Sequence, residues 1–172
     1  MMERIVEMLS FLEEEIKEAV GSHVQWLENG DFSDLEGIIQ WVNQELKSLE
    51  KDCVVISFLR SSYITGSHKF KLAAYEGEPF IEIHPLYRMI SLDFLYQESS
   101  QELAKLTEKL KDKFINVTAT ELELIRQAYM EKLYQSSKVL FTRMVEKVSE
   151  NTGKTKVFFG EEMGEIEEIG VF

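Results

Sequence analysis

Three side chains in one polar segment have the chemistry needed to hold a small ligand. Residues 60–68 include Arg60, Tyr63 and His68 among several hydroxyl side chains. A guanidinium, a phenol and an imidazole can all hydrogen-bond an anion or another small polar molecule. Ligand sites are often built on such connecting segments. Composition alone does not separate this interpretation from an ordinary hairpin loop, so both remain open.

A second pair of residues could perform acid–base chemistry. His84 and Asp93 both fall on predicted strands, and an imidazole held by a carboxylate is the central element of many hydrolase sites. The sequence has no nucleophile elbow, no H-E-x-x-H motif and no glycine loop that would cradle a phosphate. His84 also precedes Pro85, which places it at the end of a strand. A small hydrolase is therefore the third function considered, and no catalytic residue is assigned.

Metal and cofactor chemistry has no support in the residue pattern. The single cysteine, Cys53, lies in an apolar run, and the three histidines show no ligand spacing. We therefore predict no disulfide, no metal site and no cofactor. No run approaches the roughly 20 apolar residues of a membrane span. A cytoplasmic protein that contacts neither membrane nor metal is the expectation.

The elements that must position these residues begin with a predicted sheet between Cys53 and Tyr96. Residues 53–59 are apolar and β-branched, and Phe70, Leu72 and Ala74 alternate with residues of another face. A turn at 76–79 precedes a third strand around Ile81 and Ile83, and a fourth runs from Arg88 to Tyr96. Because strands adjacent in sequence usually pair, we predict a four-stranded antiparallel meander.

Helical patterns flank this sheet on both sides. An apolar stripe predicts a first helix that ends at Gly21, and residues 33–49 predict a second. Ser99 with Glu102 and Thr118 with Glu121 have the form of capping boxes for two later helices. The last helix is predicted to run nearly 30 residues, to about Ser149. The fold class is α+β, with a single domain at 1–160 and an acidic, apolar extension at 161–172.

Two sets of apolar residues are predicted to make contacts beyond the helix or segment that carries them. The last long helix is apolar over a wide arc, which favours cover by a second subunit or by the chain's own sheet and helices. The first alternative predicts a homodimer with Met130, Tyr134 and Phe141 as contacts. The extension carries Ile166, Ile169 and Phe172 among five glutamates. Disordered acidic tails usually lack such residues, so this segment is expected to dock, preferably on its own chain.

Charge is distributed unevenly along the chain. The formal net charge is −12, and twelve acidic against three basic residues lie in the first fifty. Nucleic-acid affinity depends on cationic contacts to phosphate, so a nucleic-acid partner is disfavoured. The acidic N-terminal face either lies beside the lysines of the later helices or meets a basic protein partner.

These patterns favour a non-enzymatic protein-interaction or regulatory module. In general character, the acidity, small size and helix-flanked sheet are similar to bacterial cytosolic accessory proteins such as secretion chaperones and immunity proteins, although no motif supports the comparison. The alternative is a small-ligand-binding domain that uses the 60–68 segment.

Overall fold

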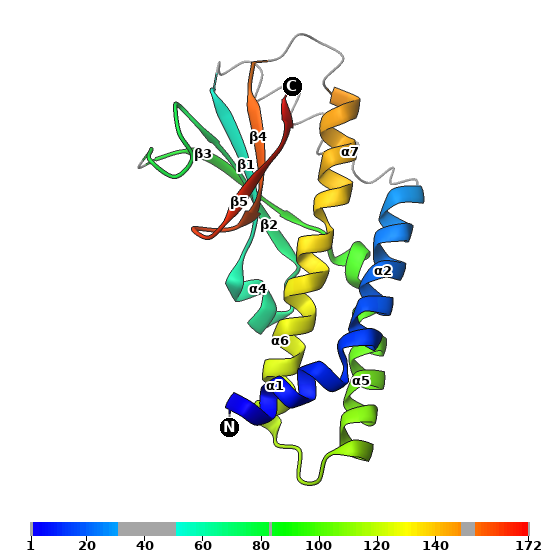
Figure 1. Cartoon of the computed structure of the whole chain (residues 1–172). Coiled ribbons are helices and arrows are strands. Elements are labelled where there is room, and N and C mark those ends of the chain that lie inside the picture. Colours follow the sequence, from blue (N-terminus) through cyan, green and yellow to red (C-terminus); the bar gives the residue numbers. More distant parts are fainter. Residues whose placement is uncertain (1, 31–50, 83, 149–153, 172) are drawn as a thin grey trace.

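The chain folds into helices packed against a five-stranded sheet, which confirms the α+β class (Figure 1). The computed structural model describes residues 2–30, 51–82, 84–148 and 154–171. The predicted helix at 33–49 lies outside these residues. The helices are α1 (Met2–Phe11), α2 (Glu13–Asn29), α4 (Arg60–Thr65), the 3₁₀ helix η4 (Asp93–Tyr96), α5 (Ser99–Lys113), α6 (Ala119–Ser136) and α7 (Lys138–Val148). The strands are β1 (Cys53–Phe58), β2 (Lys69–Tyr75), β3 (Leu86–Ser91), β4 (Lys156–Glu161) and β5 (Ile166–Val171).

The sheet is mixed and has the strand order β3-β2-β1-β4-β5. The pair β1–β2 is antiparallel, as predicted, and β2 also pairs antiparallel with β3, in place of the strand expected around Ile81 and Ile83. The pair β1–β4 is parallel, with Cys53 opposite Lys156, because the chain leaves the sheet after β3 and returns only after α5, α6 and α7. Parallel neighbours require a long crossover connection of this kind. The prediction of a purely antiparallel meander is therefore wrong in this detail.

The predicted third strand around Ile81 and Ile83 is also wrong in the described residues. Phe80 adopts a left-handed backbone with φ of 65°, which interrupts an extended chain. Its ring packs against Tyr75 at 5.8 Å between centroids, and Glu82 accepts a hydrogen bond from the Glu76 amide at 2.9 Å. The segment thus folds back over the end of β2, Ile81 is left 68% exposed, and Ile83 lies outside the described residues.

The strand predicted from Arg88 to Tyr96 is divided in the structure. Its first part belongs to β3, which begins at Leu86, and the chain then turns into η4. Leu95 and Tyr96 of η4 are buried in the core. The alternation expected for Ile90, Leu92 and Phe94 therefore does not continue along a single strand.

The C-terminal segment belongs to the sheet. Residues Ile166–Val171 form β5, which pairs antiparallel with β4 and contacts α7. Ile166 packs against the cluster of Cys53, Val55, Ala73 and Tyr75 on one face, and Ile169 packs on the helical core. The segment docks on its own chain, as the sequence favoured. Phe172 lies outside the described residues.

The predicted N-terminal helix and the predicted long C-terminal helix each contain a break that the sequence pattern did not indicate. The first apolar stripe divides at the buried Leu12 into α1 and α2, and α2 continues through Gly21 to Asn29. The predicted long C-terminal helix divides at the buried Ser137, whose hydroxyl lies 2.5 Å from the Tyr96 hydroxyl. At each break the helix axis changes direction, so that the apolar faces of the helices on both sides of the break point toward the same core.

The two predicted capping boxes had different outcomes. At the start of α6, the Glu121 amide donates to the Thr118 hydroxyl at 3.3 Å, and the Thr118 amide donates to the Glu121 carboxylate at 2.8 Å. This box is confirmed. Ser99 lies inside α5, and its hydroxyl donates to the Tyr96 carbonyl at 2.6 Å. The box predicted at Ser99 is therefore wrong, because Ser99 is the first residue of α5 and Glu98 occupies the cap position without a side-chain capping hydrogen bond.

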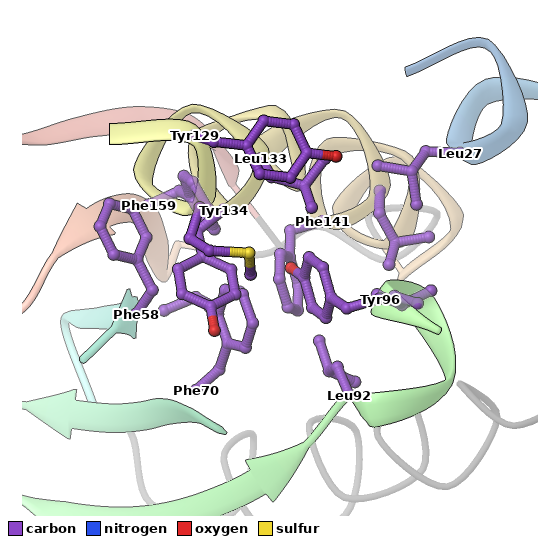
Figure 2. Packing of buried hydrophobic residues seen from close by; sticks show 14 of the residues in the cluster. Leu27, Phe58, Phe70, Leu92, Tyr96, Tyr129, Leu133, Tyr134, Phe141 and Phe159 are labelled. Atoms are coloured by element: carbon purple, nitrogen blue, oxygen red, sulfur yellow. The ribbon is translucent and has the colours of Figure 1, made fainter. Parts of the chain in front are cut away.

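The core lies between the sheet and the helices and is rich in aromatic rings (Figure 2). Phe70 of β2 lies at its centre, with ring centroids of Phe141 at 5.5 Å and Tyr134 at 5.8 Å. Met130, Tyr134 and Phe141 are all buried here. The wide apolar arc of α6 and α7 is thus covered by the sheet on one side and by α1 and α2 on the other. These three residues are not available as surface contacts for a second subunit.

The opposite face of the sheet carries no described helix. A smaller cluster lies there, and all its members come from strands and the 76–85 connection. Because side chains alternate along a strand, Val54 and Ile56 face the helices while Cys53 and Val55 face this second cluster. Figure 1 shows the resulting two-layer arrangement, with the labelled α1, α2, α5, α6 and α7 to one side of the sheet.

Candidate functional site

The residues predicted to form a ligand loop do not act together in the structure. Arg60 begins α4, and its Nε donates to the Glu161 carboxylate at 2.9 Å. The half-buried His68 ring stacks on Tyr96 at 4.7 Å, and its Nδ1 lies 2.9 Å from the Tyr134 hydroxyl. The side chain of Tyr63 lies outside the described residues. Arg60 faces an ion-pair partner and His68 faces the aromatic core.

His84 and Asp93 lie at opposite ends of β3. The six-residue strand between them spans about 20 Å at roughly 3.3 Å per residue. Asp93 instead accepts a hydrogen bond from the Ser91 hydroxyl at 2.5 Å. Both residues are exposed, and His84 and Asp93 do not form an imidazole–carboxylate pair.

A pocket of about 540 Å³ lies between α2 and α5, with η4 and α6 beneath it. Three stretches that are far apart in the sequence converge there: α2, residues 94–109 and α6. Its lining combines aromatic rings with charged groups and comprises Glu15, Glu18, Ala19, Ser22, His23 and Trp26 of α2; Phe94, Leu95, Tyr96, Gln97 and Glu98 in and after η4; Ser99, Glu102, Lys105, Leu106 and Lys109 of α5; and Tyr129 and Leu133 of α6. This volume suits a small organic ligand.

The charged groups at the pocket form two ion pairs and leave two further carboxylates. Lys109 Nζ lies 2.5 Å from the Glu15 carboxylate, and Lys105 Nζ lies 2.6 Å from that of Glu102. The hydrogen bond from Lys109 lowers the pKa of Glu15. The first pair joins an acidic N-terminal helix to a later lysine-bearing helix, which is one of the two arrangements expected from the charge distribution. Within the described residues, Glu18 and Glu98 have no ion-pair partner.

His23 is held between two aromatic rings of the pocket wall. Its ring centroid lies 5.6 Å from that of Trp26 and 5.7 Å from that of Tyr96. Burial lowers its pKa to about 4, because the charged imidazolium would lose its hydration. Its Nε2 is buried and has no hydrogen-bond partner in the part of the chain that the structure describes. At neutral pH the pocket therefore contains an uncharged imidazole with an unused polar atom.

His23→Phe is expected to flatten the acid end of the stability profile. Between about pH 6.5 and pH 4, the unfolded chain binds a proton at His23 that the folded chain does not, so wild-type stability falls as the pH falls. At 1.36 kcal/mol per pKa unit, and allowing for partial exposure of the ring, this contribution is about 2–3 kcal/mol. Urea denaturation from pH 7 to pH 4 measures it. If the free energy of unfolding fell equally with pH in the variant and the wild type, the lowered pKa of His23 would be contradicted.

Two tyrosines complete the pocket floor. Burial, and secondarily the Glu102 carboxylate, raises the pKa of Tyr129 to about 12. Burial also raises the pKa of Tyr96, whose hydroxyl contacts Ser137. Both phenols therefore remain neutral at physiological pH and present rings and hydroxyls rather than anions.

A second candidate surface is the outer edge of β3. In the described part of the chain no strand pairs with this side of β3, and five of its six residues are exposed. Leu86, Tyr87 and Met89 are 42%, 59% and 39% exposed. Lys71 Nζ lies 5.2 Å from the centroid of the Tyr87 ring. An open strand edge with apolar side chains is a template for pairing with another chain.

No local sequence pattern signals the pocket. Glu15, Ala19 and His23 follow one another at four-residue steps and share a helix face only if the helix continues through Gly21. A helix that ended at Gly21, as predicted, would leave His23 and Trp26 off this face. The residues of η4 follow a strand-like alternation, so their contribution to the pocket lining could not be predicted either.

Metal and membrane features have no counterpart in the described residues. No group of three or more His, Cys, Asp or Glu side chains is arranged there to hold a metal ion. None of the helices described combines the length and apolar character required to span a bilayer. Comparison of the chain with protein-family models, with curated proteins and with solved structures finds no match.

Proposed function

We propose that the protein is a non-enzymatic protein-interaction module that adds an extended segment of its partner to the free edge of β3. The observation that carries this proposal is the exposure of Leu86, Tyr87 and Met89 on an edge strand. Main-chain hydrogen bonds would supply affinity in such strand addition, and alternating side-chain contacts would supply specificity.

The other edge of the sheet is less suited to this role. A register shift between Val157 and Phe158 interrupts the β4–β5 pairing. Glu167 and Glu168 of β5 form ion pairs with Lys138 and Lys156. Irregularities and charged side chains are the features by which proteins protect an edge from added strands. The contrast favours β3 as the interaction edge.

The net charge favours a basic partner. At −12, the chain attracts a positively charged protein at long range and repels a second copy of itself. Exposed glutamates of α1 and α2, including Glu7 and Glu14, add to this field. A cytosolic accessory protein of the chaperone or immunity kind would act in this way, and the single buried Cys53 fits a reducing compartment.

A homodimer is the alternative occupant of the same edge. The contacts first expected for it, Met130, Tyr134 and Phe141, are buried, so a dimer would have to use other residues. Light scattering distinguishes the two cases, because the monomer mass is 20.0 kDa. A concentration-dependent dimer that Tyr87→Lys abolishes would favour self-pairing over a basic partner.

The double substitution Tyr87→Lys/Met89→Lys is expected to weaken peptide binding at the β3 edge. Random peptides displayed on phage and selected on the wild-type protein should enrich segments that alternate apolar residues and carry Lys or Arg. Affinity for these peptides should fall at least about tenfold in the double variant, because two apolar contacts are lost and two positive charges repel a basic segment.

Ile115→Lys provides the matched control for this experiment. Ile115 is 84% exposed and lies in the α5–α6 connection, away from β3. The Ile115→Lys variant should bind the selected peptides with the same affinity as the wild type. No peptide enrichment, or equal binding by the β3 variant and the control, would contradict the proposed function.

A further inference from the structure

We propose that the pocket between α2 and α5 binds a small organic cation with an aromatic or apolar body. The inference is independent of the β3 edge, because no residue of β3 lines the pocket. It rests on three properties of the pocket: its excess of carboxylates over lysines, its aromatic walls and an unpartnered polar atom.

The carboxylates set the sign of the ligand charge. Both lysines of the lining are already paired, Lys109 with Glu15 and Lys105 with Glu102. Glu18 and Glu98 are in neither pair, although Glu98 interacts electrostatically with Lys105. The lining therefore holds four carboxylates against two ammonium groups, and an anionic ligand would meet a net negative charge. A cation would pair with the carboxylates at the pocket entrance, where Glu98 is exposed to solvent.

The walls set the character of the ligand body. Trp26, Tyr96 and Tyr129 contribute ring surface, and Leu106 and Leu133 contribute apolar surface. Aromatic faces attract ammonium groups, and the attraction is stronger where water is excluded. A hydrated inorganic ion would leave most of this surface unused, and the described residues hold no group arranged as metal ligands.

The buried His23 Nε2 gives a specific reason to expect an N–H donor on the ligand. An unpartnered buried nitrogen is costly and is rare in folded proteins. In the tautomer that carries its proton on Nδ1, Nε2 is an acceptor, and an ammonium group, which offers only donors, would match it. A purely apolar ligand would fill the pocket but leave Nε2 unsatisfied.

Isothermal titration calorimetry with three probes of similar size tests the charge requirement. The probes are 2-phenylethylammonium, the neutral 2-phenylethanol and the anionic 3-phenylpropanoate. We expect the ammonium to bind to the wild-type protein and the other two to bind at least about tenfold more weakly. Changes in the His23 and Trp26 ring signals by nuclear magnetic resonance locate the bound ammonium.

Two double variants of equal net charge test the position of the charges. Glu18→Gln/Glu98→Gln removes the two pocket carboxylates and should weaken ammonium binding about tenfold. Glu14→Gln/Glu108→Gln removes two exposed carboxylates of α2 and α5 that do not line the pocket, and should leave affinity unchanged.

Four results would overturn the proposal. The first is no binding of the ammonium at millimolar concentration, and the second is binding of the alcohol or the carboxylate as tightly as the ammonium. The third is an equal loss of affinity in both double variants, which would show a general effect of net charge. The fourth is unchanged affinity in Glu18→Gln/Glu98→Gln.

Discussion

Phe70→Ala is expected to lower the free energy of unfolding by about 3–5 kcal/mol, as truncation of a fully buried phenylalanine does. The Phe70 side chain is completely buried, and five aromatic rings lie within 6.5 Å of its centroid: Phe58, Tyr96, Tyr134, Phe141 and Phe159. These neighbours come from strands β1 and β4, from η4 and from helices α6 and α7. No single element can move to fill the space, so a cavity would remain (Figure 2).

The matched control is Phe11→Ala, which removes the same atoms at an exposed position of α1. The Phe11 ring contacts Phe114 at 5.7 Å, and its loss should cost less than half as much. Urea denaturation gives both values. A Phe70→Ala midpoint equal to that of the wild type would contradict the position of Phe70 at the centre of the core.

Gly160→Ala is expected to cost at least about 3 kcal/mol, at the upper end of overpacking effects. A Cβ at Gly160 would lie 2.1 Å from the Glu165 carbonyl oxygen and 2.8 Å from the Ile166 Cα, and both are backbone atoms. The same Glu165 carbonyl accepts the Glu161 amide at 3.2 Å, so relieving the clash would also break the turn between β4 and β5.

Gly21→Ala makes the same chemical change with the opposite expected sign. No atom lies within 4 Å of an added Cβ at Gly21, which is inside α2. Alanine should therefore stabilise the protein by about 0.5–1 kcal/mol, because glycine loses more backbone entropy in a helix. Thermal unfolding of both variants measures the difference. A stable Gly160→Ala protein would contradict the β4–β5 geometry, and a destabilised Gly21→Ala protein would contradict the continuity of α2.

Local periodicity predicted the elements whose burial follows from their own sequence. The alternation of Phe70, Leu72 and Ala74 correctly identified the buried face of β2, and all three side chains lie in the main core. Thr118 and Glu121 correctly marked the start of α6, because a capping box is complete within four residues. In both cases the deciding interactions lie close together along the chain.

The errors arose where distant parts of the chain decide the structure. The parallel pairing of Cys53 with Lys156 joins residues about a hundred positions apart, and no local pattern specifies it. Ile81 follows a strand-like alternation, yet the left-handed Phe80 and the Glu82–Glu76 hydrogen bond turn this segment away from the sheet. Side-chain packing and a single hydrogen bond override a weak strand preference here.

The wide apolar arc of the C-terminal helices was correctly recognised, and the structure shows what covers it. A break at Ser137 lets α6 and α7 contact α1, α2 and the sheet together. The sequence could not distinguish this arrangement from a dimer interface, because buried residues and interface residues have the same composition. The candidate pocket shows the same limitation, since its ring and carboxylate groups come from three stretches of the chain that are far apart in the sequence.

Hydrogen exchange of the β3 amides, with and without the tightest peptide selected on the wild-type protein, tests the proposed function most directly. Strand addition predicts that Leu86–Ser91 amides on the outer edge become protected when the peptide binds, while amides of β5 are unaffected, because added main-chain hydrogen bonds form only at β3. Unchanged exchange in β3, with protection elsewhere in the chain, would contradict it.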